Sequence, residues 1–278
     1  MTSAQKIIKY VAMAFAIFLI VNIFSAILIG LYTLGNVLGL VNSNENTIME
    51  DLKTISSETY EISTLKIYLG YTNLHIKTGE EFRVETNNPK ISFSENNGSV
   101  VIKEEKNNWL SNGNNQESCL IIYIPEDMVD LDEIKLEAGA GEVIIDTLKT
   151  QGLYFNLGAG KVNIENITVT QEAEIDGGAG KIEIKSGKIN NLDLDMGVGE
   201  TILQAEITGK SDIDAGIGNL DINFYGEKEN YKIDADKGIG SIKINNREVT
   251  GDSQVFGYGE NYIKIDGGIG NITINFKE

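Results

Sequence analysis

Aspartate recurs at one position of a repeated pattern, and this recurrence is the clearest chemical signal in the sequence. Each of these residues lies two positions before a Gly-x-Gly tripeptide: Asp176, Asp195, Asp214, Asp236 and Asp266. If the repeats stack in register, the carboxylates form a column with a spacing of about 4.8 Å on an outer face. Neighbouring carboxylates at that distance repel by about 1 kcal/mol in water. A bound cation would relieve this repulsion, so the column is a candidate surface site for cations.

A second column strengthens this candidate site without identifying its ligand. Asp193, Asp212 and Asp234 lie two residues before three of the first set. Together the columns predict binding of a divalent cation or of a cationic peptide. The simpler alternative is a solvated acidic face that keeps the protein soluble and discourages pairing between sheet edges. We expect no other cofactor.

Two glycine-rich motifs resemble known sites but lack residues that those sites need. Residues 158–161 and 178–181 both read Gly-Ala-Gly-Lys, yet neither completes a phosphate-loop spacing, and strand-like alternation follows each of them. A calcium-binding nonapeptide repeat needs an aspartate after the glycines, where this chain has Lys181 or Asn271. Neither a phosphate loop nor that calcium motif is predicted.

Nucleophilic chemistry has few candidate residues in this chain. Cys119 is the only cysteine, so it cannot form an intramolecular disulfide, and it stands beside Leu120 and Ile121 in a strand-like run. A small buried apolar side chain is the expected role, because His75 is the only imidazole that could activate the thiol. The sequence therefore predicts no catalytic residue and no enzymatic activity.

A tandem repeat organises the region that carries the aspartates. The Gly-x-Gly tripeptides begin at steps of 19, 20, 19, 19, 22 and 30 residues, and apolar-polar alternation enters and leaves each one. Period-two alternation indicates strands, and glycines between strands indicate tight turns or a close approach of two backbones. The predicted turn residues are Gly139, Gly141, Gly158, Gly160, Gly178, Gly180, Gly197, Gly199, Gly216, Gly218, Gly238, Gly240, Gly268 and Gly270.

Short repeats of this kind predict an all-β solenoid. A unit of about 19 residues cannot bury its apolar face alone, whereas stacked units bury a continuous core. The middle residues of the tripeptides grow from Ala140 to Ile217 and Ile269 along the chain, which predicts an inward-facing ladder. Ile217→Asp should then be strongly destabilising, whereas Asn223→Asp at an outward position should not. We expect rungs of parallel strands over residues 131–278.

The N-terminal residues predict a membrane anchor. No charged residue occurs from Tyr10 to Val41, a run longer than the roughly 20 residues that a spanning helix needs. Lys6 and Lys9 precede it and Glu45 follows it, so the N-terminus should be cytoplasmic. We expect a cytoplasmic tail over 1–9, one transmembrane α-helix over 10–41, a tether over 42–60, and an extracytoplasmic remainder. A net charge of −18 argues against nucleic-acid binding.

Residues 61–130 predict an irregular β-rich N-terminal cap with the first rungs. Residues 69–76 read as a degenerate rung in which Thr72 replaces the second glycine. Two apolar segments flank Asn96-Asn97-Gly98, which predicts a hairpin. Trp109 lies in a loop-like segment and is expected to fold back on the cap.

These features together resemble a known family. The degenerate first rung, the strand 119–124 that ends in Pro125-Glu126, and the Gly-x-Gly rungs after it are similar to the bacterial "putative adhesin" family of β-strand-repeat domains of unknown function, over residues 62–278. The resemblance implies a β-solenoid at the bacterial cell envelope, often on a membrane anchor. It supplies no catalytic residues.

The sequence thus predicts a single-pass protein of the bacterial cytoplasmic membrane, with its C-terminal domain outside the cell. The expected function is a non-enzymatic, adhesin-like binding module, with a cell-surface, envelope-protein or cationic-peptide partner. The alternative is an envelope-stress sensing or regulatory component that docks on a membrane partner in the same cell.

Overall fold

The computed structural model describes residues 52–56, 62–105, 117–126, 131–249 and 253–277. Within these ranges the chain is almost entirely β-structure, with one short 3-10 helix, η1, at Lys228–Asn230. The all-β class predicted from the sequence is confirmed. No helix in these ranges has the length and apolar character needed to cross a membrane. The predicted anchor over 10–41 and Trp109 lie outside the described residues.

Twenty strands make up the described part of the chain. Before the regular repeats they are β1 (Lys53–Ser56), β2 (Thr64–Leu69), β3 (Asn73–Gly79), β4 (Arg83–Thr86), β5 (Ile91–Asn96), β6 (Ser99–Glu104) and β7 (Cys119–Pro125). The repeats begin with β8 (Leu131–Asp176), β9 (Ala179–Ile184), β10 (Gly187–Asn190), β11 (Leu192–Asp195), β12 (Val198–Thr208), β13 (Lys210–Asp214) and β14 (Ile217–Tyr225). The last six are β15 (Tyr231–Asp236), β16 (Ile239–Ile244), β17 (Arg247–Glu248), β18 (Ser253–Phe256), β19 (Asn261–Asp266) and β20 (Ile269–Lys277).

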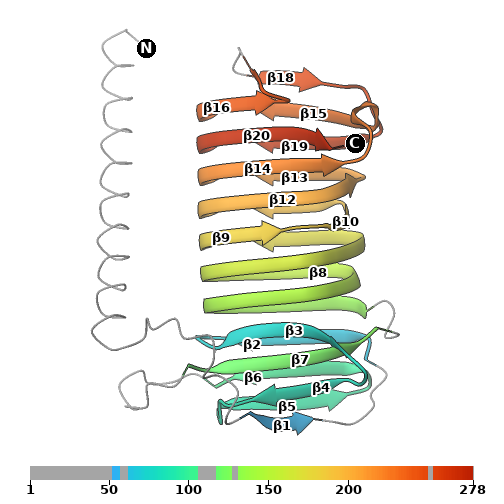
Figure 1. The fold of residues 1–278 in the computed structure, drawn as a ribbon, viewed down its shortest axis with the longest axis vertical. Helices are drawn as coiled ribbons and strands as arrows, with labels where there is room; N and C mark the ends of the chain where they lie inside the picture. The colour runs from blue at the N-terminus through green and yellow to red at the C-terminus, as the bar shows by residue number, and fades with distance from the viewer. Residues whose placement is uncertain (1–51, 57–61, 106–116, 127–130, 250–252, 278) are drawn as a thin grey trace, which may run out of the picture. The chain divides into compact units, whose positions relative to one another are not determined.

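Successive coils pair in parallel and in register, which is the arrangement of a β-solenoid. On one side β8, β9, β12 and β14 pair in turn, so that Ala159, Ala179, Val198 and Ile217 are aligned. On the opposite side β8, β11 and β13 pair in turn. Figure 1 shows these coils stacked one above another. We refer to the stack formed by β2–β20 as the solenoid.

The order of coils in space departs from the order in sequence at both ends of the solenoid. β19 and β20 lie between β13–β14 and β15–β16, although β15 and β16 come earlier in the chain. At the other end, β2 and β3 lie between β6–β7 and β8. The C-terminal coil is therefore an internal layer (Figure 1).

Alternating apolar residues fill the interior of each coil. In the aligned strands β11, β13 and β19, for example, Leu194, Ile213 and Ile265 are each at most 2% exposed. The strand geometry turns alternate side chains inward, so the polar residues between them face solvent. A continuous hydrophobic core runs through the whole solenoid.

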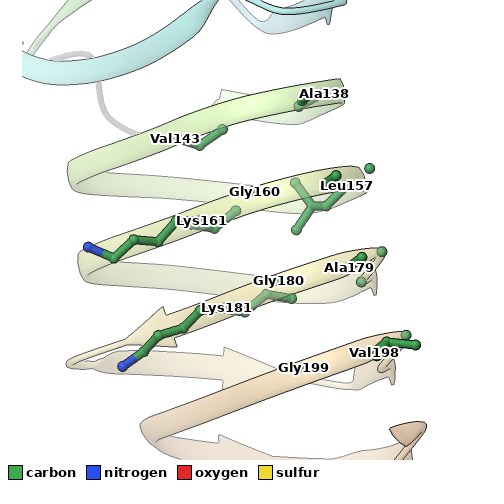
Figure 2. A pocket seen from close by; sticks show the side chains of 18 of the residues that line it. Ala138, Val143, Leu157, Gly160, Lys161, Ala179, Gly180, Lys181, Val198 and Gly199 are labelled. Atoms are coloured by element: carbon green, nitrogen blue, oxygen red, sulfur yellow. The ribbon is translucent and has the colours of Figure 1, made fainter. Parts of the chain in front are cut away.

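Glycine is required where the coils approach each other at one corner. Gly199 has φ +147°, and a Cβ atom built on it would lie 1.8 Å from the carbonyl oxygen of Gly180. A Cβ on Gly197 would lie 1.9 Å from the carbonyl oxygen of Gly178. Figure 2 shows this glycine corner, with Gly160, Gly180 and Gly199 on successive coils. At both glycine positions of a tripeptide, the absence of a side chain therefore leaves room for the backbone of the neighbouring coil.

The middle residues of the tripeptides do not form the inward ladder that we predicted from their increasing size. Val198, Ile217 and Ile269 all lie on inner coils, yet each of them is only partly buried. The fully buried positions begin further along the strand, as at Leu220. The prediction is wrong because the chain turns the corner at each tripeptide, where strand alternation is interrupted.

The N-terminal segment contains the predicted hairpin. β5 and β6 pair in antiparallel register around Asn97 and Gly98, whose φ angles of 50° and 78° place both in the left-handed region. Thr72 is buried, and its hydroxyl group lies 2.7 Å from the hydroxyl group of Ser118. Cys119 is partly exposed rather than buried, because it lies at the first position of β7.

The glycine corner generates a stability prediction. Gly199→Ala should reduce the free energy of unfolding by at least about 2 kcal/mol, because the methyl group meets a backbone carbonyl that cannot move independently. Gly70→Ala is the control, since its nearest neighbour, at 3.4 Å, is a side-chain oxygen of Glu104. Thermal melts followed by circular dichroism measure both variants. Equal melting temperatures would contradict this account of the corner.

Candidate functional site

The five predicted aspartates lie in one column, in an order that the sequence does not reveal. Asp195 is aligned with Asp176 on one side and with Asp214 on the other. Asp214 is aligned with Asp266, and Asp266 with Asp236. Asp266 thus stands between Asp214 and Asp236, because the terminal coil is an internal layer of the solenoid.

A second outward column runs beside the first on the same strands. Glu174, Asp193, Asp212, Lys264 and Asp234 are aligned in that order. We call the two columns together the acidic face. Lys264 was missed from the sequence, although it stands four residues before a Gly-x-Gly tripeptide, as the other four members do.

Crowding of like charges affects the ionisation of this face. Partial burial raises the pKa of Asp193, and the neighbouring Asp195, Asp212 and Asp176 raise it further. Partial burial likewise raises the pKa of Asp214, with Asp266, Asp195 and Asp212 adding to the effect and Lys264 opposing it. Ionised carboxylates on this face therefore destabilise one another in the folded chain.

Three carboxylates of the face lie close enough to share one cation. One oxygen from each of Asp212, Asp214 and Asp266 lies within 4.8 Å of the others. The ammonium group of Lys264 lies 3.7 Å from Asp212 Oδ1 and donates a hydrogen bond to Asp266. This hydrogen bond is the main cause of the raised pKa of Lys264. A lysine side chain of the protein itself thus neutralises part of the trio.

A surface hollow of about 280 Å³ adjoins the acidic face where its strands begin. Its floor contains Ala173, Leu192 and Ser211, and Asn191 contributes to its rim. Around the floor stand one aromatic residue, one lysine and four carboxylates: Tyr154, Lys210, Glu172, Glu174, Asp193 and Asp212. The sequence reasoning identified only Asp193 and Asp212, because it followed aspartate alone, although every residue of the hollow stands four to six positions before a Gly-x-Gly tripeptide.

Tyr154 contributes a neutral aromatic wall to the hollow. Its hydroxyl group donates a hydrogen bond to Glu172, which raises the pKa of Tyr154 to about 12. The phenol therefore remains protonated at physiological pH. An aromatic ring beside carboxylates can contact an organic cation through the face of the ring and through ionic hydrogen bonds.

The glycine corner also has a groove, but it is a poor ligand site. It encloses about 40 Å³, enough for water but far below the several hundred Å³ of a small-molecule pocket. Lys161 and Lys181 extend from neighbouring coils beside it (Figure 2). The predicted turn glycines therefore position strands rather than line a binding pocket.

The outward surface of β9, β12 and β14 differs from the acidic face in charge. Lys181 lies 3.3 Å from Glu183 and 3.2 Å from Glu200, and Lys161 lies 3.5 Å from Glu142 on β8. We call this surface the mixed face. Opposite charges alternate across its coils, whereas the acidic face places carboxylates beside carboxylates.

The candidates for covalent chemistry are separated along neighbouring strands. His75 Nε2 lies 2.9 Å from Asp146 Oδ1. In the pairing of β3 with β7, His75 is aligned with Ile121, and Cys119 is aligned with Asn73. The imidazole therefore does not face the thiol directly across the pair.

Comparison with known proteins identifies one family. The family model described as Toastrack DUF4097 matches residues 62–274. A solved structure from Bacteroides fragilis, described as a "putative adhesin", is 16% identical, covers 82% of this chain and 98% of its own, and has a TM-score of 0.46. A second solved structure, from Clostridium sporogenes, is described as a "putative cell adhesion protein". It is 20% identical, covers 81% of this chain and 98% of its own, and has a TM-score of 0.32. The comparison with curated proteins gives no match.

The acidic face generates a prediction about pH. The folded-state pKa of Asp214 is raised above its ordinary value of 3.8, so the folded chain binds more protons than the unfolded chain between the two values. Stability therefore falls as pH rises through this window, and the loss persists at neutral pH. Asp214→Asn should raise the melting temperature by about 1–2 °C at pH 7 and have no effect near pH 3.

The matched control is Asp221→Asn, which removes the same charge on β14 of the opposite side. The melting temperatures of both variants, measured at pH 7 and near pH 3, show whether the stabilisation is specific to the column. If Asp221→Asn stabilised the protein equally, net charge rather than the column would be responsible.

Proposed function

The chain belongs to the Toastrack DUF4097 family, and from that premise we propose that it is a membrane-anchored, extracytoplasmic binding module whose acidic face binds a cationic partner. The partner that fits best is a lysine-rich peptide or protein segment. The single observation that carries this proposal is the acidic face with its adjoining hollow.

Charge complementarity supports a cationic partner. The two columns place nine carboxylates and one ammonium group in two parallel rows. Rows of like charge focus the potential at the surface and attract an oppositely charged partner from solution. The mixed face offers no such field, because its lysines are paired with glutamates.

The contacts of Lys264 support lysine as the recognised group. Its ammonium interacts with Asp212 of one column and Asp266 of the other. An ammonium group supplied by a partner could be held in the same way between Asp193 and Asp195 or Asp176, where no lysine of this chain intervenes in the register. Such groups would also relieve the repulsion from Asp195 and Asp212, which adds to partial burial in raising the pKa of Asp193.

The hollow would hold one end of such a partner. An ammonium group seated there would meet carboxylates of Glu174 and Asp193 and the ring of Tyr154. Ala173 and Leu192 would contact the methylene groups of a lysine side chain. Lys210 would oppose a second positive charge at that end.

A location outside the cytoplasmic membrane is part of the proposal. It is supported by the uncharged run over residues 10–41 and by the lysines that precede it. The anchor would hold the solenoid at the cell envelope, where cationic segments of envelope proteins are available.

A non-enzymatic role is also part of the proposal. It is supported by the separation of Cys119 from His75 across the β3–β7 pair. The acidic face itself is open and repetitive, whereas acid-base catalysis requires carboxylates with distinct environments.

Binding of an oligolysine peptide tests the proposed face. Asp193→Asn/Asp212→Asn should weaken binding about fivefold at low salt, because two exposed ion pairs are lost. Glu183→Gln/Asp221→Asn removes the same charge from the other side of the solenoid and should change binding by less than about twofold. Fluorescence anisotropy of a labelled peptide measures both. Equal weakening would show that binding follows net charge alone and would contradict the proposal.

Protease protection tests the proposed topology. In intact spheroplasts, a tag at residue 2 should remain shielded from added protease, while a tag at the C-terminus should be removed. Lysed spheroplasts are the control, in which both tags should be cleaved. An N-terminal tag that is removed from intact spheroplasts would contradict an N-in anchor.

A further inference from the structure

Aligned residues on neighbouring regular coils are about 19 residues apart in the sequence, and we call this spacing the regular step. Near the C-terminal end of the solenoid, extra residues interrupt it. On the neighbouring coils of β11 and β13, Leu192 and Ser211 are 19 residues apart and joined by a hydrogen bond. On β14 and β20, the aligned Asn219 and Asn271 are also joined by a hydrogen bond, yet they are 52 residues apart. The chain between β14 and β20 is therefore much longer than one regular step, and this excess causes the irregular glycine spacing in the sequence.

The excess corresponds to one continuous segment. Asn261 lies on the coil next to that of Gly209, at the equivalent position. The Gly209 amide donates a 3.1 Å hydrogen bond to Asn261 Oδ1. Gly209 is also the single residue that joins β12 to β13. Joining Glu227 directly to Asn261 would therefore restore the regular step between β14 and β20. The segment 228–260, which we call the C-terminal cap, contains η1 and β15–β18.

The C-terminal cap covers the exposed side of the last regular coil. β15 and β16 pair in parallel with β19 and β20. Two antiparallel strands then follow, β17 against β16 and β18 against β15. This change of direction, with Asn245 and Asn246 in the left-handed region between β16 and β17, ends the parallel pattern.

The N-terminal end of the solenoid is built in the same way. Asn73 accepts a hydrogen bond from the amide of Glu142 on the neighbouring coil, although the two are 69 residues apart, more than three times the regular step. The intervening chain includes β6 and β7, which pair in parallel on the outer side of β2 and β3. Antiparallel β5 and β4 then pair with β6 and β7. Both ends thus carry an outward excursion inserted between two regular coils.

We propose that the C-terminal cap is an insertion that the solenoid does not need in order to fold, and that it prevents the edges of β19 and β20 from pairing with a second copy of this chain. A parallel edge without a cap presents a row of unpaired backbone groups. It would also expose the ends of the apolar columns at Ile263, Ile265, Ile272 and Ile274, which are now at most 4% exposed.

A second copy is the partner that these edges fit. β20 already pairs along its whole length with β14, a strand of the same repeat, so its apolar alternation matches strands of its own kind. The same edges of two copies, related by a two-fold axis, would pair in antiparallel orientation and would cover each other's apolar column ends. An unrelated partner would need the same coil width and corner positions.

Packing at the cap boundary is compatible with removal of the cap. Phe224 and Phe276 stack within the regular coils, with ring centroids 5.5 Å apart. Tyr231 and Phe256 of the cap pack on them at centroid distances of 4.8 Å and 6.3 Å. Deleting the cap leaves the first contact in place and uncovers Phe276, which adds apolar surface for self-association.

Deletion of residues 228–260 from the full chain tests both parts of the proposal. The variant should retain a β-sheet circular dichroism spectrum and a cooperative melt, and its mass should double with increasing concentration in light scattering under the same detergent conditions as the parent chain. The control deletes residues 198–216, one regular step, and should keep the mass of the parent because both ends remain capped. A folded variant that keeps the parent mass overturns the blocking role, and an unfolded variant overturns the claim that the cap is dispensable.

Hydrogen exchange of the unmodified chain gives a test that does not depend on the deletion. Amides of β19 and β20 should exchange at least about tenfold more slowly than those of β15 and β16, because the cap can open while the inner coil stays paired with β13 and β14. Faster exchange in β19 and β20, as in a fraying chain terminus, would overturn the proposal.

Discussion

Parallel, in-register pairing at the strand spacing of about 4.8 Å is the constraint on which the rest of this structure depends. It places residues that occupy the same position of the repeat, here called the same repeat phase, directly above one another, whatever their chemistry. Apolar phases become continuous interior columns, as at Leu194, Ile213 and Ile265. Glycine phases become columns where backbones meet, as at Gly180 and Gly199. Acidic phases become columns of carboxylates, where the same rule creates repulsion.

The repulsion on the acidic face is a local cost within a fold stabilised by its interior. Each coil buries several large aliphatic side chains, and burial of one such side chain contributes about 1.5–3 kcal/mol. Carboxylates at the strand spacing oppose this by about 1 kcal/mol per neighbouring pair in water, and by more where they are partly buried. The solenoid can therefore carry an unfavourable acidic face and remain folded, and Lys264 lowers the cost at one coil. This margin is what leaves the face free to serve in recognition.

Much of the fold follows from periodicity, because each coil repeats the same constraints. The strands, the glycine corner and the phase of the aspartates could all be read from the sequence. The inward ladder was wrong for a reason visible in the spacing: Ile175 and Ile182 are both buried and lie an odd number of residues apart. Strict alternation cannot place both inside, so the chain must break its alternation at the tripeptide between them.

The order of the coils could not be predicted from spacing alone. The two longest steps between glycine tripeptides are compatible with a longer loop or with an inserted coil, and only backbone pairing separates the two. The hollow was missed for a different reason, since it combines three neighbouring positions of the repeat on several coils, with Tyr154 and Lys210 four and six residues before their tripeptides. Repetition makes columns predictable, while features that combine unlike phases depend on three-dimensional packing.

The C-terminal cap keeps the acidic positions of the repeat on β15 but ends the parallel pairing at β17 and β18. Carrying the acidic columns and ending the stack are therefore separate roles. Asp234 and Asp236 on β15 continue both acidic columns beyond the last regular coil. Ile239 continues the glycine-corner column, yet it is exposed because no further coil covers it. The antiparallel β17 and β18 then end the pairing. An end that served only to stop the stack would not need acidic residues at these phases. Their presence supports an acidic face whose length extends over the C-terminal cap as well as the regular coils.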